Sequence, residues 1–360
     1  MLAIDLVLAA TLVAVTAAFW FLPGMVAQTI SFGVRIPPAY QSDIAVRAAT
    51  RGFRLRLALS ALISLALLLL IARPSVTLIA PQLLLLALFF ANYLVAHRQV
   101  LRAKQAGHWF VGLHQGAAAA TAPDLGQGAF PWLYLLPALL LIALTAVVGA
   151  LRYPALPAQI AVHFNLSGQP NRYASKSWGS ALFPLWVELV VTSLLVALSY
   201  FTWRSPRQLD PAHPEASLQR SWRFRTGMIR LLLLLVAAVN LTLLASGLLS
   251  WGLLPPALPV HLGIVLVPLL AAVAVVLISY RMGQEGVRLP SAEGPDTGLV
   301  ARDDDRLWKG GLVYFNPQDP AIIVAKRFGI GWTFNFGRWQ AWLLIPAIAA
   351  VVLALRLLVR

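Results

Sequence analysis

The dominant pattern in this chain is a series of eight long apolar stretches separated by polar segments. Each stretch is close to the ~20 residues that an α-helix needs to cross a bilayer. Hydrocarbon offers no hydrogen-bonding partners, so we predict that these stretches are transmembrane helices. The expected fold is an all-α integral membrane protein. The stretches are Leu2–Leu22, Leu55–Ala72, Val76–Ala96, Pro131–Leu151, Ala181–Trp203, Leu231–Ser250, Val260–Tyr280 and Gln340–Val359.

The composition supports the same fold class. The chain is 59% hydrophobic and only 11% charged, whereas soluble domains are about 25% charged, which excludes a water-soluble globular enzyme. The absence of cysteine excludes disulfides, thiolate metal sites and cysteine nucleophiles. A net charge of +15 would suggest nucleic acid for a soluble protein. Here we attribute it to the orientation of the loops, and we expect the lipid bilayer rather than nucleic acid as the partner.

Basic residues are distributed unevenly between the loops. The first, third, fifth and seventh loops carry 22 Lys and Arg residues, and the opposite face carries 6. Loops rich in Lys and Arg remain in the cytoplasm. We therefore predict that these four loops are cytoplasmic and that both termini are extracellular.

The apolar stretches and loops divide the chain into four predicted regions. Residues 1–130 form a three-helix membrane region with basic cytoplasmic loops, in which only Arg73–Ser75 separate the second and third spans as a tight hairpin. Residues 131–281 form a four-helix membrane region with an external loop at 152–180. Residues 282–338 form a cytoplasmic β-rich segment, and residues 339–360 form the last transmembrane helix.

The first cytoplasmic loop contains a predicted helix start. Pro37 and Pro38 stop any preceding helix because proline lacks a backbone donor. Ser42 stands at the expected N-cap, with Asp43 in the first turn. From Ile44 a basic amphipathic helix is expected to run into the second span. We favour an interfacial anchor on anionic lipid over a partner site.

The segment 282–338 combines a Gly/Pro-rich linker with β-like runs. Leu312–Phe315 and Ala321–Ala325 flank Asn316-Pro-Gln-Asp-Pro, which predicts a small hairpin. Phe328–Gly337 alternates aromatic and small residues, which predicts another short strand. The acidic run Asp303–Asp305 is interpreted as a solvated run that caps the following strand, in preference to a cation site.

Glu188 is the only acidic residue well inside a predicted span. A carboxylate there costs several kcal/mol unless it is paired or protonated, so an intramembrane acid is a candidate functional group. The alternative is a structural hydrogen bond to a neighbouring helix, for example to Asn240 or Asn92.

Two histidines follow similar Pro-Ala-Leu-Pro sequences on the predicted external face. Pro154–Pro157 precedes His163, and Pro256–Pro259 precedes His261. A degenerate repeat would bring both histidines above Glu188, which would make a zinc site conceivable. Chance matches are common among such abundant residues, so we assign no metal, no cofactor and no catalytic residue. The chain has no HExxH, P-loop or G-x-S-x-G motif.

Three segments resemble a known bacterial architecture. PALPAQIAVHFNLSGQPNRYASK resembles the HFN-x-x-G loop of a domain-of-unknown-function family that includes the SdpI-like immunity proteins. DDDRLWKGGLVYFNPQDPAIIVAKRFGIGWTFNFG resembles the C-terminal domain often joined to it in Gram-positive membrane proteins, and FGVRIPPAYQSD is similar to the same architecture. The resemblance implies a multi-pass plasma-membrane protein. SdpI-like members protect against a secreted toxin and sequester a repressor at the membrane, but this chain has more predicted spans than they do.

Three functions follow from these features. We favour a non-enzymatic receptor or immunity-type protein that recognises an extracellular peptide or envelope component and docks a cytoplasmic regulator. The alternatives are a secondary transporter that uses Glu188 as its coupling carboxylate, supported also by Pro81, Pro137, Pro184 and Pro268 as helix interruptions, and an intramembrane hydrolase. The predicted ligand-binding residues are His163, Asn165, Gly168, Glu188, Asn240 and His261. The predicted docking residues are Asp303, Asp304, Asp305, Trp308, Phe328, Gly329, Trp332 and Asn335.

Overall fold

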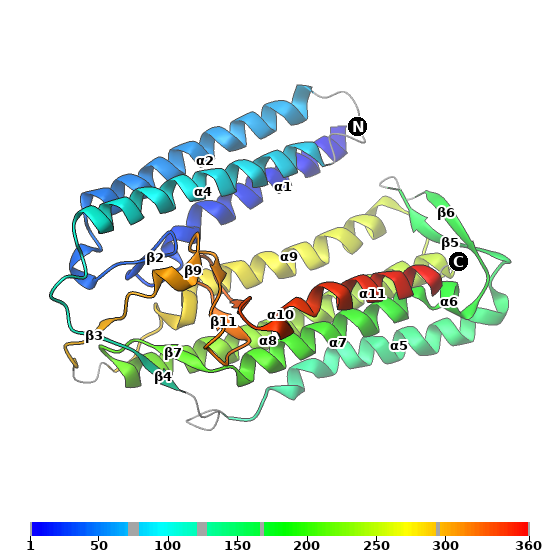
Figure 1. Ribbon diagram of the computed structural model, residues 1–360. Helices are drawn as coiled ribbons and strands as arrows, with labels where there is room; N and C mark the ends of the chain where they lie inside the picture. Colours follow the sequence, from blue (N-terminus) through cyan, green and yellow to red (C-terminus); the bar gives the residue numbers. More distant parts are fainter. Residues whose placement is uncertain (1, 71–78, 121–127, 166–168, 293–295, 359–360) are drawn as a thin grey trace. The chain divides into compact units, whose positions relative to one another are not determined.

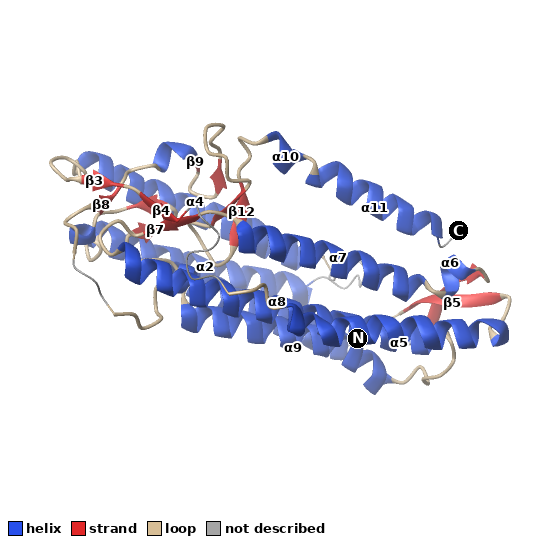
Figure 2. Cartoon of the chain, turned by 90° about the horizontal axis from the view of Figure 1, so that it is seen from below, coloured by secondary structure: helices blue, strands red, loops and turns tan. Residues whose placement is uncertain are grey.

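The computed structural model describes residues 2–70, 79–120, 128–165, 169–292 and 296–358. Long helices dominate it, and the strands are short (Figures 1 and 2). Among the described residues, 7 helices are long and apolar enough to cross a membrane. The 20-residue helix α1, Leu2–Phe21, is a further apolar helix at the start of the chain. The predicted all-α, multi-pass membrane fold is therefore confirmed.

The chain divides into two compact units. Unit 1 contains Met1–Leu125, Pro206–Phe224 and Ser279–Arg338. Unit 2 contains Gly126–Ser205, Arg225–Ile278 and Trp339–Arg360. Each unit therefore combines segments that are far apart in the sequence.

Three helices form the apolar part of unit 1: α1, α2 (Ile44–Leu70) and α4 (Ala80–Ala106), which lie side by side in Figure 1. The predicted amphipathic helix does run from Ile44 without a break into the second span. Its N-cap prediction was wrong by one residue, because the Asp43 carboxylate accepts a 2.7 Å hydrogen bond from the amide of Ala45. The predicted tight hairpin at Arg73–Ser75 lies outside the described residues.

Aromatic side chains fill the core of these helices. The rings of Phe19 and Phe89 stack with centroids 3.8 Å apart. Phe53 is fully buried between α1 and α4 residues, and Phe32 from the loop after α1 joins the same cluster. The loop between α1 and α2 is thus part of the core of unit 1.

Short paired strands complete unit 1. Two hairpins form in the segment 282–338: β9 (Trp308–Lys309) pairs with β10 (Val313–Tyr314), and β11 (Ile323–Ala325) pairs with β12 (Trp332–Phe334). The predicted strands are therefore present, but the predicted pairing across Asn316–Pro320 was wrong. Each strand instead pairs with its nearer neighbour, across a loop with glycines at positive φ. The other pairs are β1 (Ile30–Ser31) with β2 (Val34–Arg35), β3 (Gln115–Gly116) with β8 (Val300–Ala301), and β4 (Ala118–Ala120) with β7 (Arg207–Leu209).

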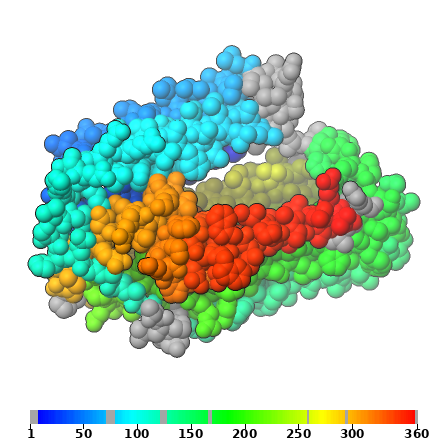
Figure 3. All heavy atoms as spheres, viewed as in Figure 1, coloured from blue at the N-terminus to red at the C-terminus, as the bar shows by residue number. Residues whose placement is uncertain are grey.

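The orange C-terminal segment of unit 1 lies against the cyan helix α4 in the space-filling view (Figure 3). The hydroxyl of Tyr93 in α4 lies 3.0 Å from the carbonyl oxygen of Gly310 in that segment. The segment 282–338 therefore folds onto the N-terminal helices instead of forming a separate domain.

Unit 2 is built from helices and one β-hairpin. In chain order it has α5 (Leu136–Arg152), β5 (Gln159–Phe164), β6 (Pro170–Ser175), α6 (Trp178–Ala181), α7 (Phe183–Arg204), most of α8 (Pro214–Ser250) and of α9 (Leu258–Met282), α10 (Trp339–Trp342) and α11 (Leu344–Leu358). Helix α7 packs against both α5 and α11. The buried guanidinium of Arg225 in α8 donates to the carbonyls of Thr202 and Ser205 at 2.8 and 2.7 Å, which satisfies the C-terminal end of α7.

Candidate functional site

Strands β5 and β6 form an antiparallel hairpin within the predicted external loop at 152–180. Ile160 pairs with Ala174, and both side chains are buried. The register shifts after Ala161 so that His163 lies opposite Arg172. A register shift of this kind marks a β-bulge or a similar irregularity, and both polar side chains are exposed. The hairpin thus buries Ile160 and Ala174 and exposes His163, Asn171, Arg172 and Tyr173.

Two contacts hold this hairpin on the helices of unit 2. The ammonium of Lys176 donates to the carbonyl oxygens of Pro154 and Leu156 at 3.1 and 2.9 Å and lies 5.1 Å from the Tyr153 ring centre. Ser177 and Ser180 then form a reciprocal capping box that starts α6. Because carbonyls that precede β5 bind a side chain that follows β6, the ends of the hairpin are closed.

The predicted ligand residues of this loop have separate local partners. The Nδ1 atom of His163 lies 2.5 Å from the side-chain oxygen of Asn171 on the exposed face. The side-chain oxygen of Asn165 accepts from the amide of Gln169 at 2.8 Å and shapes the hairpin turn. Gly168 lies outside the described residues. The Nδ1 atom of His261 lies 3.0 Å from the carbonyl of Ala257, one helical turn earlier.

The proposed similarity between the two histidine segments does not extend to their structure. His163 lies on strand β5, whereas His261 lies in the first turns of helix α9. The rings of Phe164 and His261 do approach, with centroids 5.8 Å apart. Across the described residues, no group of three or more His, Cys, Asp or Glu side chains is arranged to hold a metal ion.

Glu188 is completely buried in α7, with 0% of its surface exposed. The hydroxyl of Thr145 in α5, also 0% exposed, donates a 2.8 Å hydrogen bond to its Oε1 atom. The Oε2 atom is buried and has no hydrogen-bond partner among the described residues. The suggestion that Asn240 or Asn92 would bind Glu188 was wrong, because Asn92 bonds Ser60 in unit 1 at 3.0 Å.

Asn240 in α8 instead bonds Thr192, one helical turn beyond Glu188 on α7. Its amide nitrogen donates to the Thr192 hydroxyl at 3.0 Å and to the Ala138 carbonyl in α5 at 3.4 Å. Asn240 is 0% exposed. Helices α5, α7 and α8 therefore share a buried polar column of four side chains, which are Thr145, Glu188, Thr192 and Asn240.

Most of the prolines that suggested broken helices start helices. Pro81, Pro137 and Pro184 occupy the first two positions of α4, α5 and α7, where the missing amide hydrogen has no intrahelical partner to lose. Of the four, Pro268 alone lies inside a helix, α9. Helix interruption by proline, which had supported a transporter, is therefore limited to one of these four residues.

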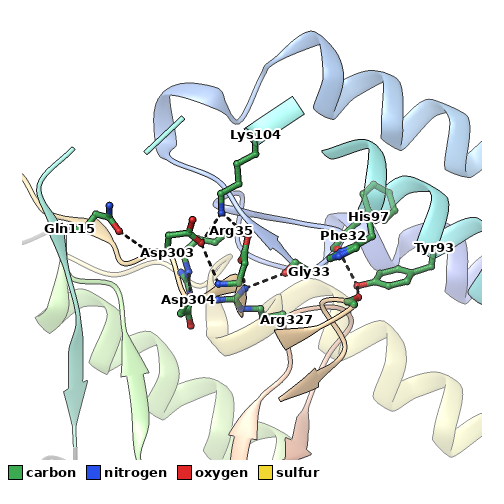
Figure 4. A network of polar contacts seen from close by, with 12 residues as sticks. Phe32, Gly33, Arg35, Tyr93, His97, Lys104, Gln115, Asp303, Asp304 and Arg327 are labelled. Atoms are coloured by element: carbon green, nitrogen blue, oxygen red, sulfur yellow. Dashed lines mark hydrogen bonds and ion pairs between the residues drawn. The ribbon is translucent and has the colours of Figure 1, made fainter. Parts of the chain in front are cut away.

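The acidic run Asp303–Asp305 is the centre of an ion-pair cluster in unit 1 (Figure 4). Asp304 pairs with Arg35 at 2.8 Å and with Arg327. Lys104 lies 2.7 Å from Asp303 and 2.6 Å from Asp305. The interpretation as a solvated run was wrong, because three bases from distant segments neutralise the three acids.

The cluster is mostly shielded from water. The side chains of Arg327 and Lys104 are 3% and 7% exposed, and that of Asp304 is 13% exposed. Burial alone would raise the pKa of Asp304, but the charges and hydrogen bonds of Arg35 and Arg327 outweigh it and hold this pKa below its ordinary value. Burial lowers the pKa of Arg327, and the two carboxylates offset part of this effect.

The cluster connects three segments of unit 1 through backbone groups as well. The amide of Arg35 donates to Asp305 at 3.0 Å, and Arg327 donates to the carbonyl of Gly33 at 3.3 Å. The Nδ1 atom of His97 lies 2.8 Å from the Phe32 carbonyl (Figure 4). The loop after α1, the end of α4 and the C-terminal segment are therefore joined by one polar network.

The remaining predicted docking residues also lie within unit 1. Trp308 is buried, and the guanidinium of Arg327 lies 5.1 Å from its ring centre. The Phe328 ring packs on Tyr93 with centroids 4.5 Å apart, and Gly329 follows it at a φ of +82°. Trp332 lies near Phe224 with ring centroids 5.8 Å apart, and Asn335 is 0% exposed. These side chains contribute to the fold of the segment.

Several important residues carry no local signal in the sequence. Nothing in the local sequence marks the four residues that contact acidic side chains, which are Thr145, Arg35, Lys104 and Arg327. One indirect signal exists: three adjacent aspartates in a chain with only 13 acidic residues require counter-charges when the segment folds.

Two family models match parts of the chain. The model of a domain of unknown function (DUF1648) matches residues 140–187, from α5 through the β5–β6 hairpin to the start of α7. The model of a family of unknown function (DUF5808) matches residues 317–342, from before β11 to α10. Both segments in which the sequence resembled known domains are therefore matched by models of domains of unknown function. No curated protein and no solved structure matches the chain.

Proposed function

We propose that this chain is a receptor or immunity-type protein of a bacterial plasma membrane that recognises an extracellular ligand through the exposed face of the β5–β6 hairpin. The hairpin, anchored at both ends and exposing a polar face, is the observation that carries the proposal. A surface held in this way is pre-organised, which reduces the entropy cost of binding. The sequence likeness to SdpI-like proteins supports the immunity role.

The exposed face combines groups that suit a peptide or an envelope component. Tyr173 is 57% exposed, and the exposed Arg172 and His163 lie opposite each other across the hairpin. Tyrosine and arginine contribute strongly to binding surfaces, because they combine large contact area with hydrogen-bond donors. The positive charge of Arg172 favours a ligand with an acidic or carboxylate group.

The first test is the side of the membrane on which the hairpin lies. The native chain has no cysteine, so Tyr173→Cys and Lys309→Cys can be labelled with a membrane-impermeant maleimide in intact bacteria. The proposal requires that position 173 reacts in intact cells and that position 309 reacts only after permeabilisation. The reverse result would place the hairpin inside and end the receptor proposal.

The second test is protection. Sensitive cells that express the protein are challenged with fractionated peptides secreted by a producing culture. Arg172→Ala and Tyr173→Ala should abolish protection while leaving membrane insertion unchanged. Ser175→Ala, at an exposed position of the same hairpin, is the matched control and should keep protection. Equal protection by all variants would show that the hairpin does not recognise the toxin.

Proton-coupled secondary transport is a second candidate, favoured by the complete burial of Glu188. Glu188→Gln separates the two candidates, since a receptor keeps binding and protection whereas a transporter loses coupling. The intramembrane hydrolase has no comparable support, because His163 and His261 have local partners of their own.

A further inference from the structure

The polar column of unit 2 contains one group that its neighbours leave incompletely bonded. Thr192 and Asn240 bond each other, and Thr145 donates to Glu188. The Oε2 atom of Glu188 is buried without a hydrogen-bond partner among the described residues. A buried polar atom without a partner costs about 1–3 kcal/mol, and more when the group is charged. This cost would be reduced if the Oε2 atom bound a ligand or a proton.

Several basic side chains of the helices around Glu188 have partners of their own. Arg152 of α5 donates to the carbonyl of Trp251 at 3.3 Å. On α8, Arg225 binds the C-terminal end of α7, and Arg230 lies 5.2 Å from the Tyr134 ring centre. Arg204 ends α7, and Arg356 stands in the last turn of α11. Thr145, which contacts Glu188, is uncharged, and so are Thr192 and Asn240, the next polar pair in the column.

A carboxylate without a cationic partner is unfavourable at membrane depth, so the small ion that fits this site is a proton. We propose that Glu188, positioned by Thr145, is a proton-binding site in the helices of unit 2. In the closed arrangement the carboxyl group holds the proton. When the start of α7 opens to water, the O–H bond breaks, the proton passes to water, and the Thr145 hydroxyl remains as a donor to the carboxylate.

The position of Glu188 allows this exchange. It lies five residues after Phe183, the first residue of α7, which is about 7.5 Å along the helix axis at 1.5 Å per residue. Helix α7 follows the β5–β6 hairpin and the short helix α6, and the Trp251 indole binds the Ala181 carbonyl there at 2.8 Å. The carboxyl group therefore lies within two helical turns of the start of α7. The proposal does not depend on ligand recognition by the hairpin.

The test uses the full-length protein in liposomes and dicyclohexylcarbodiimide, an apolar reagent that modifies protonated carboxyl groups shielded from water. Peptide mapping by mass spectrometry should find the adduct on Glu188, with a labelling rate that decreases as the pH is raised. Glu188→Gln should lose the adduct completely. Thr145→Val should move the pH of half-maximal labelling upward, because the carboxylate loses its donor. Glu215, an exposed carboxylate of α8, is the matched control and should react only with a water-soluble carbodiimide.

Infrared spectroscopy gives a second measurement that does not need the reagent. The carbonyl stretch of a protonated carboxyl group should be present in the native protein and missing in Glu188→Gln. If Glu188 is unmodified in liposomes at every pH but is modified after denaturation, the proposal is overturned. Labelling that does not change with pH would also overturn it, because it would show a permanently neutral structural group.

Discussion

The backbones of Gly33 and Gly311, far apart in the sequence, meet directly inside unit 1. A Cβ atom on Gly33 would lie 2.5 Å from the carbonyl oxygen of Gly311, and one on Gly311 would lie 2.8 Å from the Cα of Gly33. Both residues have positive φ, +76° and +71°. The Tyr93 hydroxyl lies beside both glycines and 3.0 Å from the carbonyl of Phe32. Only glycine fits at either position, so this contact seats the C-terminal segment on the N-terminal helices.

Gly33→Ala should therefore destabilise unit 1 strongly. The added methyl group would collide with the backbone of Gly311, which cannot move aside as a flexible side chain could. This overpacking should cost about 1–3 kcal/mol. The positive φ, which is unfavourable for alanine, adds a further cost. Gly112→Ala is the matched control, because Gly112 has the same φ of +76° with no atom within 4 Å of the added Cβ. Unfolding in detergent by denaturant titration measures the difference. Equal losses for the two variants would show that the close approach is not maintained.

Asp304→Asn should lower the stability of unit 1 by about 3 kcal/mol, because it leaves Arg35 and Arg327 without their shared carboxylate. Asp303→Asn should cost less, since the Asp303 side chain is 33% exposed and, among the described residues, forms an ion pair only with Lys104. Thermal unfolding of both variants in detergent compares them. The ion-pair account fails if Asp303→Asn is as damaging as Asp304→Asn.

The same cluster predicts a dependence on pH. The pKa of Asp304 is lowered in the fold from its ordinary value of 3.8. A group with a lowered folded pKa stabilises the fold above its unfolded pKa and loses that contribution as the pH falls through the folded pKa. The contribution of Asp304 to stability should therefore be constant near neutral pH and fall below about pH 4. Asp304→Asn should show a weaker fall over the same range, measured by thermal unfolding in a buffer series.

The helices could be predicted from sequence because the bilayer requires long apolar segments. Their ends could not be predicted in the same way. The polar first turns of α8, which begin at Pro214, and the basic first turns of α2, which begin at Ile44, extend these helices beyond the apolar pattern. Strand positions in the segment 282–338 followed from side-chain pattern. The partner of each strand could not be predicted from this pattern. The pairing depends on tight turns at Gly310, Gly329 and Gly331, which have positive φ and reverse the chain direction before Asn316–Pro320 or after Ala325.

The candidate site was predictable where one residue is exceptional by itself. A carboxylate inside an apolar span, Glu188, stands out in any sequence of this kind. Its partner Thr145 does not, because hydroxyls are common in membrane helices and bond their own backbone. The acids Asp303–Asp305 stood out as well, but whether they face water depends on Arg35, Lys104 and Arg327. Long-range pairing of this kind has no local pattern.

Asn335→Asp should unfold the loop between β10 and β11. The Asn335 amide nitrogen donates to the carbonyls of Asn316, Asp319 and Ala321 at 2.8–3.2 Å, and its oxygen accepts from the amide of Asn316 at 2.9 Å. An aspartate of the same shape would lose both donor hydrogens and place a charge beside those carbonyls, at a cost of ~3 kcal/mol. Limited proteolysis should show new cleavage at 316–321. Asn171→Asp, on the exposed hairpin face, should leave the digestion pattern unchanged.

Gly149→Ala and Gly263→Ala should change the stability of unit 2 in opposite directions. A Cβ on Gly149 in α5 would lie 2.5 Å from the Leu182 side chain and 2.8 Å from the ring of Trp251, whereas one on Gly263 in α9 meets no atom within 4 Å. Alanine favours a helix over glycine by about 0.5–1 kcal/mol. At Gly263 that preference should stabilise the protein slightly.

At Gly149 the collision outweighs the helix preference. The Trp251 ring cannot move aside easily, because its indole nitrogen is bound to the Ala181 carbonyl at 2.8 Å. The expected result is a net loss of about 1–2 kcal/mol for Gly149→Ala, measured by the same denaturant titration in detergent. A shift of the same sign for both variants would mean that α5 does not pack closely on Trp251.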